Sequence, residues 1–280
     1  MKRERITISY DDRIRVTEST KKHIQRAELC QRSISSGRPF DEKKIMQISD
    51  FFRTTTTWSS CAVEGCTFSI GETKTLLEYG ITIQGKSLKE TLEVSDHANA
   101  FDYMMELVKN GSVLKEDDIK KLHELLYATA DPKIAGKYKV EQNFISGSNY
   151  TTIPPKQIAE EMKKLERWIE DTTGKLHPIV QAAELHKKIT YIHPFADGNG
   201  RCARLCMNVV LIQNGYLPCQ ISPAMRLDYI NALESDRSNK TDYFIRFIAE
   251  AETETEKDFM RALDISMPKL PSPDCEPELY

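Results

Sequence analysis

The chain has 280 residues, enough for one large domain or two small ones with a substantial buried core. Hydrophobic residues make up 40% and charged residues 29%, with only 12 Gly and 12 Pro, which excludes collagen-like, coiled-coil and wholly disordered proteins. The formal net charge is −3 and both signs are spread along the chain, so no basic surface for nucleic acid or an anionic membrane is expected.

The first residues and the cysteines indicate the cytosol. The N-terminal stretch MKRERITISY is charged but has no apolar run like that of a signal peptide, and no stretch reaches the roughly 18 apolar residues of a membrane span. The seven cysteines form no C-x-x-C pair and have no zinc-like spacing with histidine. We therefore expect reduced thiols in a cytoplasmic protein.

The first third of the chain shows the weakest periodicity. Residues 1–53 are predicted to form an N-terminal extension, in which Ile6 and Ile8 alternate with polar residues as in a short strand. Residues 54–69 are rich in Ser, Thr and small residues, which predicts a short helix entered from a Ser/Thr cap. This helix opens a second segment, residues 54–95.

A mainly α-helical core is predicted over residues 96–263. Apolar side chains recur there at spacings of three and four, as on one face of an amphipathic helix. The predicted helices cover residues 97–110, 115–130, 156–170, 178–192, 201–214, 228–235 and 242–263. Four prolines make residues 264–280 a tail that we expect to be disordered.

One segment of the core breaks the helical period. Residues 137–140 and 143–145 are short, extended-looking runs that lead into a turn at 146–149. They predict an exposed β-hairpin, here called the flap, at residues 136–153. The expected fold class is thus mainly α with one β-hairpin flap.

The run HPFADGNGRCAR, residues 193–204, carries the most chemical information. A residue before Pro avoids the α region, so His193 should leave its helix and turn toward the loop. Gly198 and Gly200 allow backbone angles that are closed to other residues, and Asn199 between them tolerates the left-handed region. The amides of this loop, with the N-terminus of the next helix, predict a pocket suited to phosphate oxygens.

Charged side chains in the same run suit a phosphate chain with its metal. Asp197 offers the carboxylate oxygen that Mg²⁺ prefers when substrate phosphates supply other ligands. Arg201 and Arg204 share a helix face and can bind the outer phosphates. His193 is then the group that takes a proton from an attacking hydroxyl. An EF-hand is excluded because Cys202 stands where a Gly is required, and a Walker A loop because no G-K-[ST] occurs.

This run resembles the H-P-F-x-[D/E]-G-N-G-R-x-x-R signature of the Fic (Fido) family, most of whose members transfer AMP from ATP to a protein hydroxyl. The resemblance implies that His193 is the general base and that Asp197 binds Mg²⁺. It places the nucleotide phosphates on Asp197, Gly198, Asn199, Gly200, Arg201, Cys202, Ala203 and Arg204. It also implies that the flap pairs with an extended target segment and touches ATP through Ile145, Ser146, Gly147 and Ser148. Tyr229 would form a wall of the adenine pocket.

A second motif lies far from the first in the sequence. Ser60-Cys61-Ala62-Val63-Glu64-Gly65 is similar to the family's inhibitory-helix pattern [S/T]-x-x-x-E-[G/N]. Taken alone, it is equally well a capped helix with a solvated Glu. The resemblance implies that Glu64 pairs with Arg204, within a motif whose other defining residues are Ser60 and Gly65. ATP could then bind only with its α-phosphorus misplaced for in-line attack.

The resemblance covers about residues 54–260 and predicts an autoinhibited protein adenylyltransferase (AMPylator). AMP would pass from Mg²⁺·ATP to a Ser, Thr or Tyr hydroxyl of a target protein docked on the flap. Three alternatives stay open: removal of AMP, transfer from another nucleotide donor, and a Fic-like module that holds nucleotide without turnover. The resemblance also allows self-modification and a homodimer.

Overall fold

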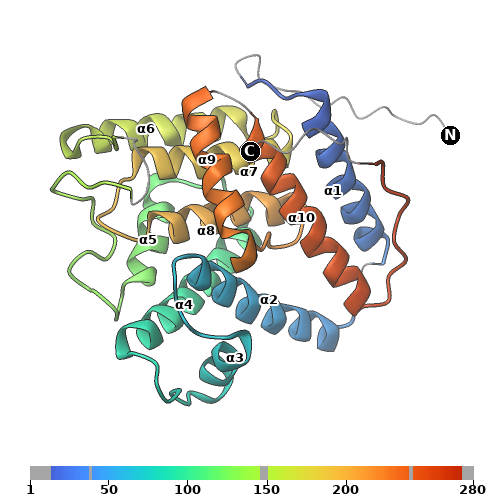
Figure 1. Ribbon diagram of the computed structural model, residues 1–280, viewed down its shortest axis with the longest axis horizontal. Helices are drawn as coiled ribbons and strands as arrows, with labels where there is room; N and C mark the ends of the chain where they lie inside the picture. The colour runs from blue at the N-terminus through green and yellow to red at the C-terminus, as the bar shows by residue number, and fades with distance from the viewer. Residues whose placement is uncertain (1–13, 38–39, 146–150, 240–241, 273–280) are drawn as a thin grey trace.

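The structure is a computed structural model that describes residues 14–37, 40–145, 151–239 and 242–272 (Figure 1). Within these ranges the chain is mostly helical and its β-structure consists of isolated bridges, which confirms the mainly α prediction. None of the helices there has the length and apolar character that a bilayer crossing requires. The helices are α1 (Glu18–Ser36), α2 (Glu42–Val63), α3 (Ile70–Tyr79), α4 (Leu88–Asn110), α5 (Glu116–Leu126), α6 (Pro155–Thr172), α7 (Pro178–Ile192), α8 (Asn199–Gln213), α9 (Arg226–Asn239) and α10 (Tyr243–Ala262), with a short 3₁₀ turn, η1 (Pro223–Met225).

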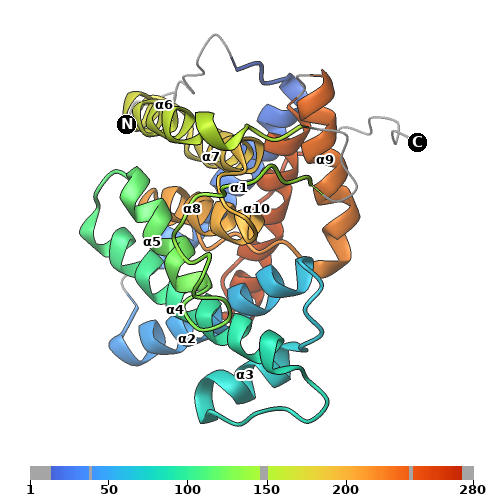
Figure 2. The same cartoon turned by 90° about the vertical axis from the view of Figure 1, so that its left-hand side faces the viewer.

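Helices α7 and α8 pack side by side at the centre of the molecule (Figures 1 and 2). Every residue of α8 from Arg201 to Leu211 is buried. A helix that is buried on all faces must be enclosed by other elements. The helices that contact α8 are α2, α4, α5 and α7. The accessible parts of α8 are therefore its two ends, with Gly200 in the first turn and Ile212 and Gln213 in the last.

Helix α2 differs from the short helix predicted within residues 54–69. It begins at Glu42, and its N-cap is Asp41, whose carboxylate accepts from the Lys44 amide at 2.8 Å. The Ser and Thr residues lie inside the helix and are buried, with hydroxyls that can bond back to the preceding turn, as Thr55 does to the Phe51 carbonyl at 2.9 Å. A boundary between residues 53 and 54 would therefore cut a continuous helix.

The N-terminal extension contains a helix of the core. Helix α1 packs along α10 and buries Ile24, Ala27, Cys30 and Ile34. Residues 264–272 of the predicted tail follow α10 without regular secondary structure, and the Arg26 side chain donates to the Pro271 carbonyl. This contact and the packing of Leu270 on the core differ from the disorder predicted there. The strand predicted at Ile6 and Ile8 lies outside the described residues.

Two further helix starts were missed, although the sequence carries signals for both. Ser69 and Glu72 form a capping box at the start of α3. Ser87 and Glu90 form another at the start of α4, which therefore begins nine residues before the predicted position. In each box the N-cap hydroxyl accepts from the amide three residues on, and the Glu side chain accepts from the N-cap amide. The S-x-x-E spacing is thus the local signal for both starts.

The flap is anchored at its base to the loop that follows α7. Tyr138 forms a bridge with Phe195, and the Lys139 amide donates to the Pro194 carbonyl at 2.9 Å. Phe144 and Thr151 form an isolated bridge across the predicted turn. The turn itself lies outside the described residues, so the hairpin stays a prediction.

Helix α10 buries two glutamates one turn apart. Glu252 and Glu256 are both fully buried, and the Glu252 carboxylate accepts one hydrogen bond, from the Leu217 amide at 3.1 Å. The other three carboxylate oxygens have no hydrogen-bond partner among the described residues. Burial raises the pKa of both side chains, and their mutual repulsion adds to this for Glu256. The pair is therefore held largely protonated near neutral pH.

Glu256→Gln should make the fold more stable in mildly alkaline solution. The pKa of this acid is higher in the folded chain than in the unfolded chain. Its contribution to stability is complete below the unfolded pKa and is lost gradually as the pH rises from the unfolded pKa to the folded pKa. The neutral amide has no such loss. We expect the melting temperature at pH 8.5 to rise by roughly 3 °C or more, since about 1 kcal/mol corresponds to 2–4 °C in a domain of this size.

Thermal unfolding at pH 5.5, 7 and 8.5 measures this effect. The exposed Glu254, which pairs with Lys257 on the same helix, supplies the control Glu254→Gln. A Glu256→Gln variant whose stability falls with pH as steeply as that of the parent would contradict the assignment of a protonated buried acid.

Candidate active site

Helix α7 ends at His193, where the predicted departure from the helix occurs. The backbone of His193 is left-handed (φ 52°, ψ 58°), outside the right-handed helical region that a residue before Pro avoids. Its amide still donates to the Ile189 carbonyl at 2.9 Å, so His193 caps the helix. Its Nδ1 lies 3.3 Å from the Thr190 carbonyl oxygen, and donation there leaves the lone pair on Nε2. The left-handed backbone ends α7 at this residue, and the His193 side chain lines the cavity described below.

The loop after His193 is fixed by a buried asparagine. Asn199 Oδ1 accepts from the Phe195 amide and its Nδ2 donates to the Phe195 carbonyl, both at 3.0 Å. The Phe195 ring stacks on His123, with ring centroids 3.7 Å apart. The Asn199 side chain thus holds the loop closed, with both of its polar groups bonded to the Phe195 backbone.

His123 holds the other side of the same loop. Its Nδ1 accepts from the Gly136 amide at 3.1 Å, so its Nε2 donates to the Asp197 carbonyl at 2.9 Å. Burial lowers the pKa of His123 to about 4, which keeps the ring neutral. The flap also holds this loop, because the side-chain amide of Asn143 donates to the carbonyls of Phe195 and Ala196 at 3.0 and 3.2 Å.

Two glycines of the loop meet different neighbours. Gly198 has φ 74°, and a Cβ there would lie 2.4 Å from Cε2 of Tyr127. Gly200 lies in the first turn of α8, where a Cβ would lie 2.5 Å from Oε1 of Glu64. Glycine at 198 is therefore required by both backbone angle and space, whereas at 200 the obstacle is the end of a flexible side chain.

Gly198→Ala should lower the free energy of unfolding by roughly 2 kcal/mol or more, because a residue with a Cβ would be strained at this φ and would collide with an aromatic ring. Gly200→Ala is the matched comparison. It needs only a shift of the Glu64 carboxylate, so its stability should stay within about 1 kcal/mol of the parent. Urea unfolding at neutral pH measures both, and equal losses for the two variants would contradict this reading of the site.

Arg201 is buried beneath the loop. It donates to the hydroxyl of Tyr127, and its guanidinium lies 5.0 Å from the centre of that ring. The carboxylates of Glu93 and Asp197 are each 3.9 Å away. Its Nε has no hydrogen-bond partner among the described residues. A buried guanidinium with an unused donor is suited to an anionic ligand.

Asp197 carries the exposed carboxylate of the loop. Partial desolvation acts to raise its pKa, but hydrogen bonds from the Tyr127 hydroxyl and the Gly198 amide, together with Arg201, lower the pKa overall. The side chain is 65% exposed and ionised at neutral pH. No group of three metal-ligating side chains occurs in the parts of the chain that the structure describes. A divalent cation here would depend on one carboxylate and on ligands from its substrate.

The predicted pair of Glu64 and Arg204 is present. Arg204 is buried, and its Nη2 donates to Oε1 of Glu64 at 2.7 Å. The same guanidinium donates to the Ser60 hydroxyl at 3.0 Å, to the Ser60 carbonyl at 2.9 Å and to the Tyr229 hydroxyl at 3.3 Å. Because Ser60 and Glu64 belong to α2, the end of that helix is tied to the side of α8.

A Schellman motif sets the position of Glu64. Glu64 is the C-cap of α2, and Gly65 follows with φ 100°. The Gly65 amide donates to the Ala62 carbonyl at 2.9 Å, and the Cys66 amide to the Cys61 carbonyl at 3.1 Å. Gly65 therefore acts through the backbone and does not touch Arg204.

A cavity of about 460 Å³ lies at this loop, and Arg204 lies behind two of its lining residues, Glu64 and Tyr229. This volume suits a small-molecule ligand. The predicted residues that line it are Glu64, Ile145, His193, Asp197, Gly198, Asn199, Gly200, Arg201 and Tyr229. Phe144, Glu93 and Arg226 also line it and had not been predicted.

The structure does not bring every predicted residue to this cavity, and Arg204, Ser60 and Gly65 do not line it. Cys202 and Ala203 are fully buried in the core, and the Cys202 amide already donates to the Gly198 carbonyl at 3.0 Å. Both helix positions face inward, so their side chains do not line the cavity, and their contact with a nucleotide stays a prediction. Ser146, Gly147 and Ser148 lie outside the described residues.

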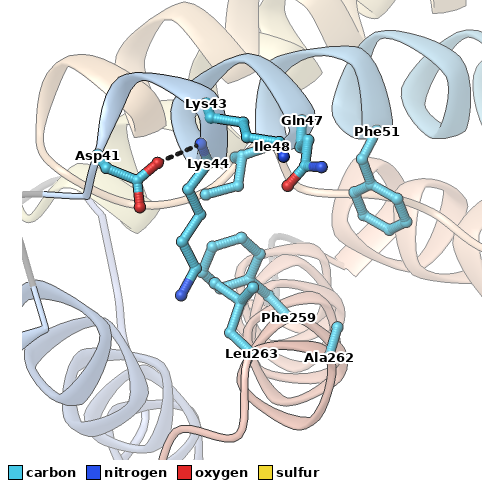
Figure 3. A pocket seen from close by; sticks show the side chains of 9 residues that line it. All are labelled: Asp41, Lys43, Lys44, Gln47, Ile48, Phe51, Phe259, Ala262 and Leu263. Carbon is cyan, nitrogen blue, oxygen red and sulfur yellow. Dashed lines mark hydrogen bonds between the residues drawn. The ribbon is translucent and has the colours of Figure 1, made fainter.

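A second cavity, of about 430 Å³, lies between the start of α2 and the end of α10 (Figure 3). Its lining is mostly apolar, and Figure 3 shows the Lys44 side chain reaching from α2 toward Leu263. The Asp41 carboxylate on its rim is engaged as the cap of α2. This cavity contains none of the predicted site residues.

The comparison with protein families agrees with the geometry of the first cavity. Residues 113–211 match the Fic/DOC family model. The chain belongs to the Fic/DOC family. The matched span runs through α5 to α8 and includes the whole loop, whereas Glu64 and Tyr229 reach the same cavity from outside it.

Several relatives of this chain carry an activity in their names. Protein adenylyltransferase fic-1 of Caenorhabditis elegans is 33% identical over 195 residues, which cover 69% of this chain and 38% of that protein. Protein adenylyltransferase Fic of Nematostella vectensis is 34% identical over 194 residues, which cover 69% of this chain and 45% of the relative. The chain thus spans less than half the length of these curated relatives.

The arrangement of helices is also that of a solved Fic protein. A structure of Fic-1 from C. elegans superposes with a TM-score of 0.79 and 26% identity, covering 88% of this chain and 73% of that one. The superposition extends well beyond the span matched by the family model, so the fold is shared outside the Fic loop as well.

Sequence reasoning missed the residues that hold the Fic loop from outside. Tyr127 comes from the end of α5, His123 from the same helix, and Asn143 from the flap. None belongs to a local motif, and each reaches the loop only through the packing of distant segments.

Proposed function

We propose that this chain transfers AMP from ATP to a hydroxyl group of a protein. The observation that carries the proposal is the meeting of one basic nitrogen, one carboxylate and two buried guanidiniums at the N-terminal turn of α8. The names of the curated relatives support it. In this proposal the triphosphate lies along the loop, the adenine lies by Tyr229, and a target segment docks on the flap beside Ile145.

The start of α8 supplies the phosphate site. The first intrahelical bond runs from the Cys202 amide to the Gly198 carbonyl, so the amides of residues 199–201 precede it. These amides and the positive end of the helix dipole attract phosphate oxygens. Arg201 adds a fixed positive charge beneath them, and Asp197 would hold Mg²⁺ together with the phosphates. That ion, when bound, would neutralise part of the charge of the leaving pyrophosphate.

His193 would supply the proton acceptor. Its Nε2 takes the proton of a Ser, Thr or Tyr hydroxyl while the oxygen of that group attacks the α-phosphorus. The bond from the α-phosphorus to the oxygen that bridges it to the β-phosphorus breaks, and pyrophosphate leaves with the electron pair. Target hydroxyls and a hydroxyl of the chain itself are both substrates of this reaction.

We infer that Glu64 inhibits this reaction. Its carboxylate holds the Arg204 guanidinium and lies against Gly200, at the turn where the outer phosphates would bind. Two anions compete for one guanidinium, so ATP can reach its productive position only after Glu64 has moved. The Glu64 carboxylate could equally orient a water for the removal of AMP, which keeps that reaction as the second candidate.

Labelled ATP tests the proposal. The Glu64→Gly chain is incubated with Mg²⁺ and either α-labelled or γ-labelled ATP, and the label on the chain and on lysate proteins is followed. AMP transfer predicts protein label from the α position only. Label from the γ position would indicate phosphate transfer, and loss of label from previously modified proteins would indicate removal of AMP. The cytosolic location and the homodimer stay predictions.

A further inference from the structure

A buried histidine on α7 contacts the nucleotide site from behind. His186 lies two turns before His193 and is fully buried. Its Nε2 is 3.0 Å from the Tyr229 hydroxyl oxygen, which is 3.3 Å from Nη1 of Arg204. The three side chains come from α7, α9 and α8, and they form a continuous chain of hydrogen bonds.

The direction of these hydrogen bonds follows from the chemistry of the groups. Arg204 can only donate, so the Tyr229 oxygen accepts from it. The single hydroxyl proton of Tyr229 then goes to Nε2 of His186, which must be unprotonated. Burial and the nearby positive charge of Arg204 lower the pKa of His186 well below its usual range, in agreement with a neutral ring.

This arrangement leaves one donor of His186 without a partner. With Nε2 as the acceptor, the proton lies on Nδ1, which has no hydrogen-bond partner among the described residues. A buried donor in this state costs free energy, and the ring otherwise packs on Phe244, with centroids 4.9 Å apart. An apolar side chain would fill this space at least as well, so stability alone does not account for a histidine here.

We propose that His186 is a positioning residue for nucleotide binding, acting through Tyr229 on Arg204. It fixes the Tyr229 hydroxyl with an oxygen lone pair facing the guanidinium. Among the hydrogen bonds of Arg204, those to Ser60 and Glu64 come from α2, whereas the Tyr229 bond is independent of α2. When Glu64 leaves, the Tyr229 bond that His186 fixes helps the Ser60 contacts to hold Arg204 at the outer phosphates. This inference rests on the proposed nucleotide role of Arg204.

Substitutions in the Glu64→Gly chain test this role. His186→Leu removes the acceptor, Tyr229→Phe removes the hydroxyl, and His186→Gln keeps a polar group near Nε2. We expect His186→Leu to raise the KM for ATP about tenfold with kcat changed less than about twofold, the pattern of a lost binding contact. His186→Gln should recover most of the affinity, and the melting temperature of His186→Leu should not fall.

The double variant decides whether His186 acts through Tyr229. If it does, His186→Leu adds nothing to the effect of Tyr229→Phe on KM. Effects that multiply, or a His186→Leu variant with an unchanged KM, would overturn the inference. If His186→Leu does not fold, His186→Phe carries the same comparison.

The measurements also separate this inference from the proposed function. The Kd of Mg²⁺·ATP is measured by calorimetry for every variant beside the rate of AMP transfer. A chain that binds ATP without transferring AMP would contradict the proposed reaction, and the tenfold rise in Kd would still support His186. A chain that transfers AMP with the same Kd in all variants would retain the function and remove the role of His186.

Discussion

Replacing Glu64 with Gly should raise the rate of AMP transfer about ten- to hundredfold at subsaturating ATP, which corresponds to roughly 1.4–2.8 kcal/mol. The 2.7 Å contact of Glu64 with Arg204 compensates a buried positive charge. Without it, the guanidinium keeps its polar contacts to Ser60 and Tyr229 but lacks an anionic partner. A phosphate of ATP then supplies the missing charge, so removal of Glu64 favours the nucleotide-bound state.

A matched pair of variants separates charge from the presence of the side chain. Glu64→Gln keeps the length and one acceptor oxygen but removes the charge, and its rate should lie between those of the parent and Glu64→Gly. Both variants should be less stable than the parent when ATP is absent, and Mg²⁺·ATP should restore stability by mass action. Transfer of α-label and thermal unfolding measure the two effects. Equal transfer rates in all three chains would remove the inhibitory role of Glu64.

His193→Ala in the Glu64→Gly chain should lower AMP transfer by roughly 10²–10⁴-fold, the usual contribution of a general base. Its affinity for Mg²⁺·ATP should stay within about threefold, because in the proposed function the α8 amides and the two arginines, not His193, would hold the phosphates. A loss of rate without a loss of affinity is the signature of a group that acts in the chemical step.

The control for this experiment lies at the other end of the same helix. His177 is the N-cap of α7, where Nδ1 accepts from the Ile179 amide at 3.2 Å and Nε2 contacts Glu28 at 3.1 Å. His177→Ala should cost stability, roughly 1 kcal/mol, but should leave transfer unchanged under conditions where the chain is folded. Retained transfer in the His193→Ala chain would assign the proton transfer to another group or to solvent.

The loop and the helices around it were predictable because their signals are local. Residues 193–204 carry Pro and Gly at fixed places, and α7 was predicted with the bounds that the structure shows. The start of α2 was not predicted, because the Ser and Thr residues from position 54 on were interpreted as a cap. Those from 54 to 60 lie inside the helix and are buried. Helix α1 buries small and sparse apolar residues, a weak periodic signal, and it depends on α10 for its partner.

For the site, too, local motifs predicted some contacts and missed others. The pairing of Glu64 with Arg204 followed from two motifs 140 residues apart, and the contact is present. Cys202 and Ala203 were assigned to the nucleotide because they fall within the motif, but the helix turns both into the core. His186 and Tyr127 have no motif of their own. Their roles depend on the angles at which α7, α5 and α9 pack, which no local pattern specifies.

The Schellman motif at the end of α2 has a consequence for how Glu64 can move. Two backbone hydrogen bonds close the last turn, from the Gly65 and Cys66 amides, and Glu64 lies between the residues that they join. Opening that turn would detach Glu64 from Arg204 while the buried hydroxyl-rich part of α2 stays packed. Such an opening is a local fluctuation with a free energy far below that of global unfolding. Fraying at the end of α2 would thus be one way to release the Glu64–Arg204 contact without unpacking the rest of the fold.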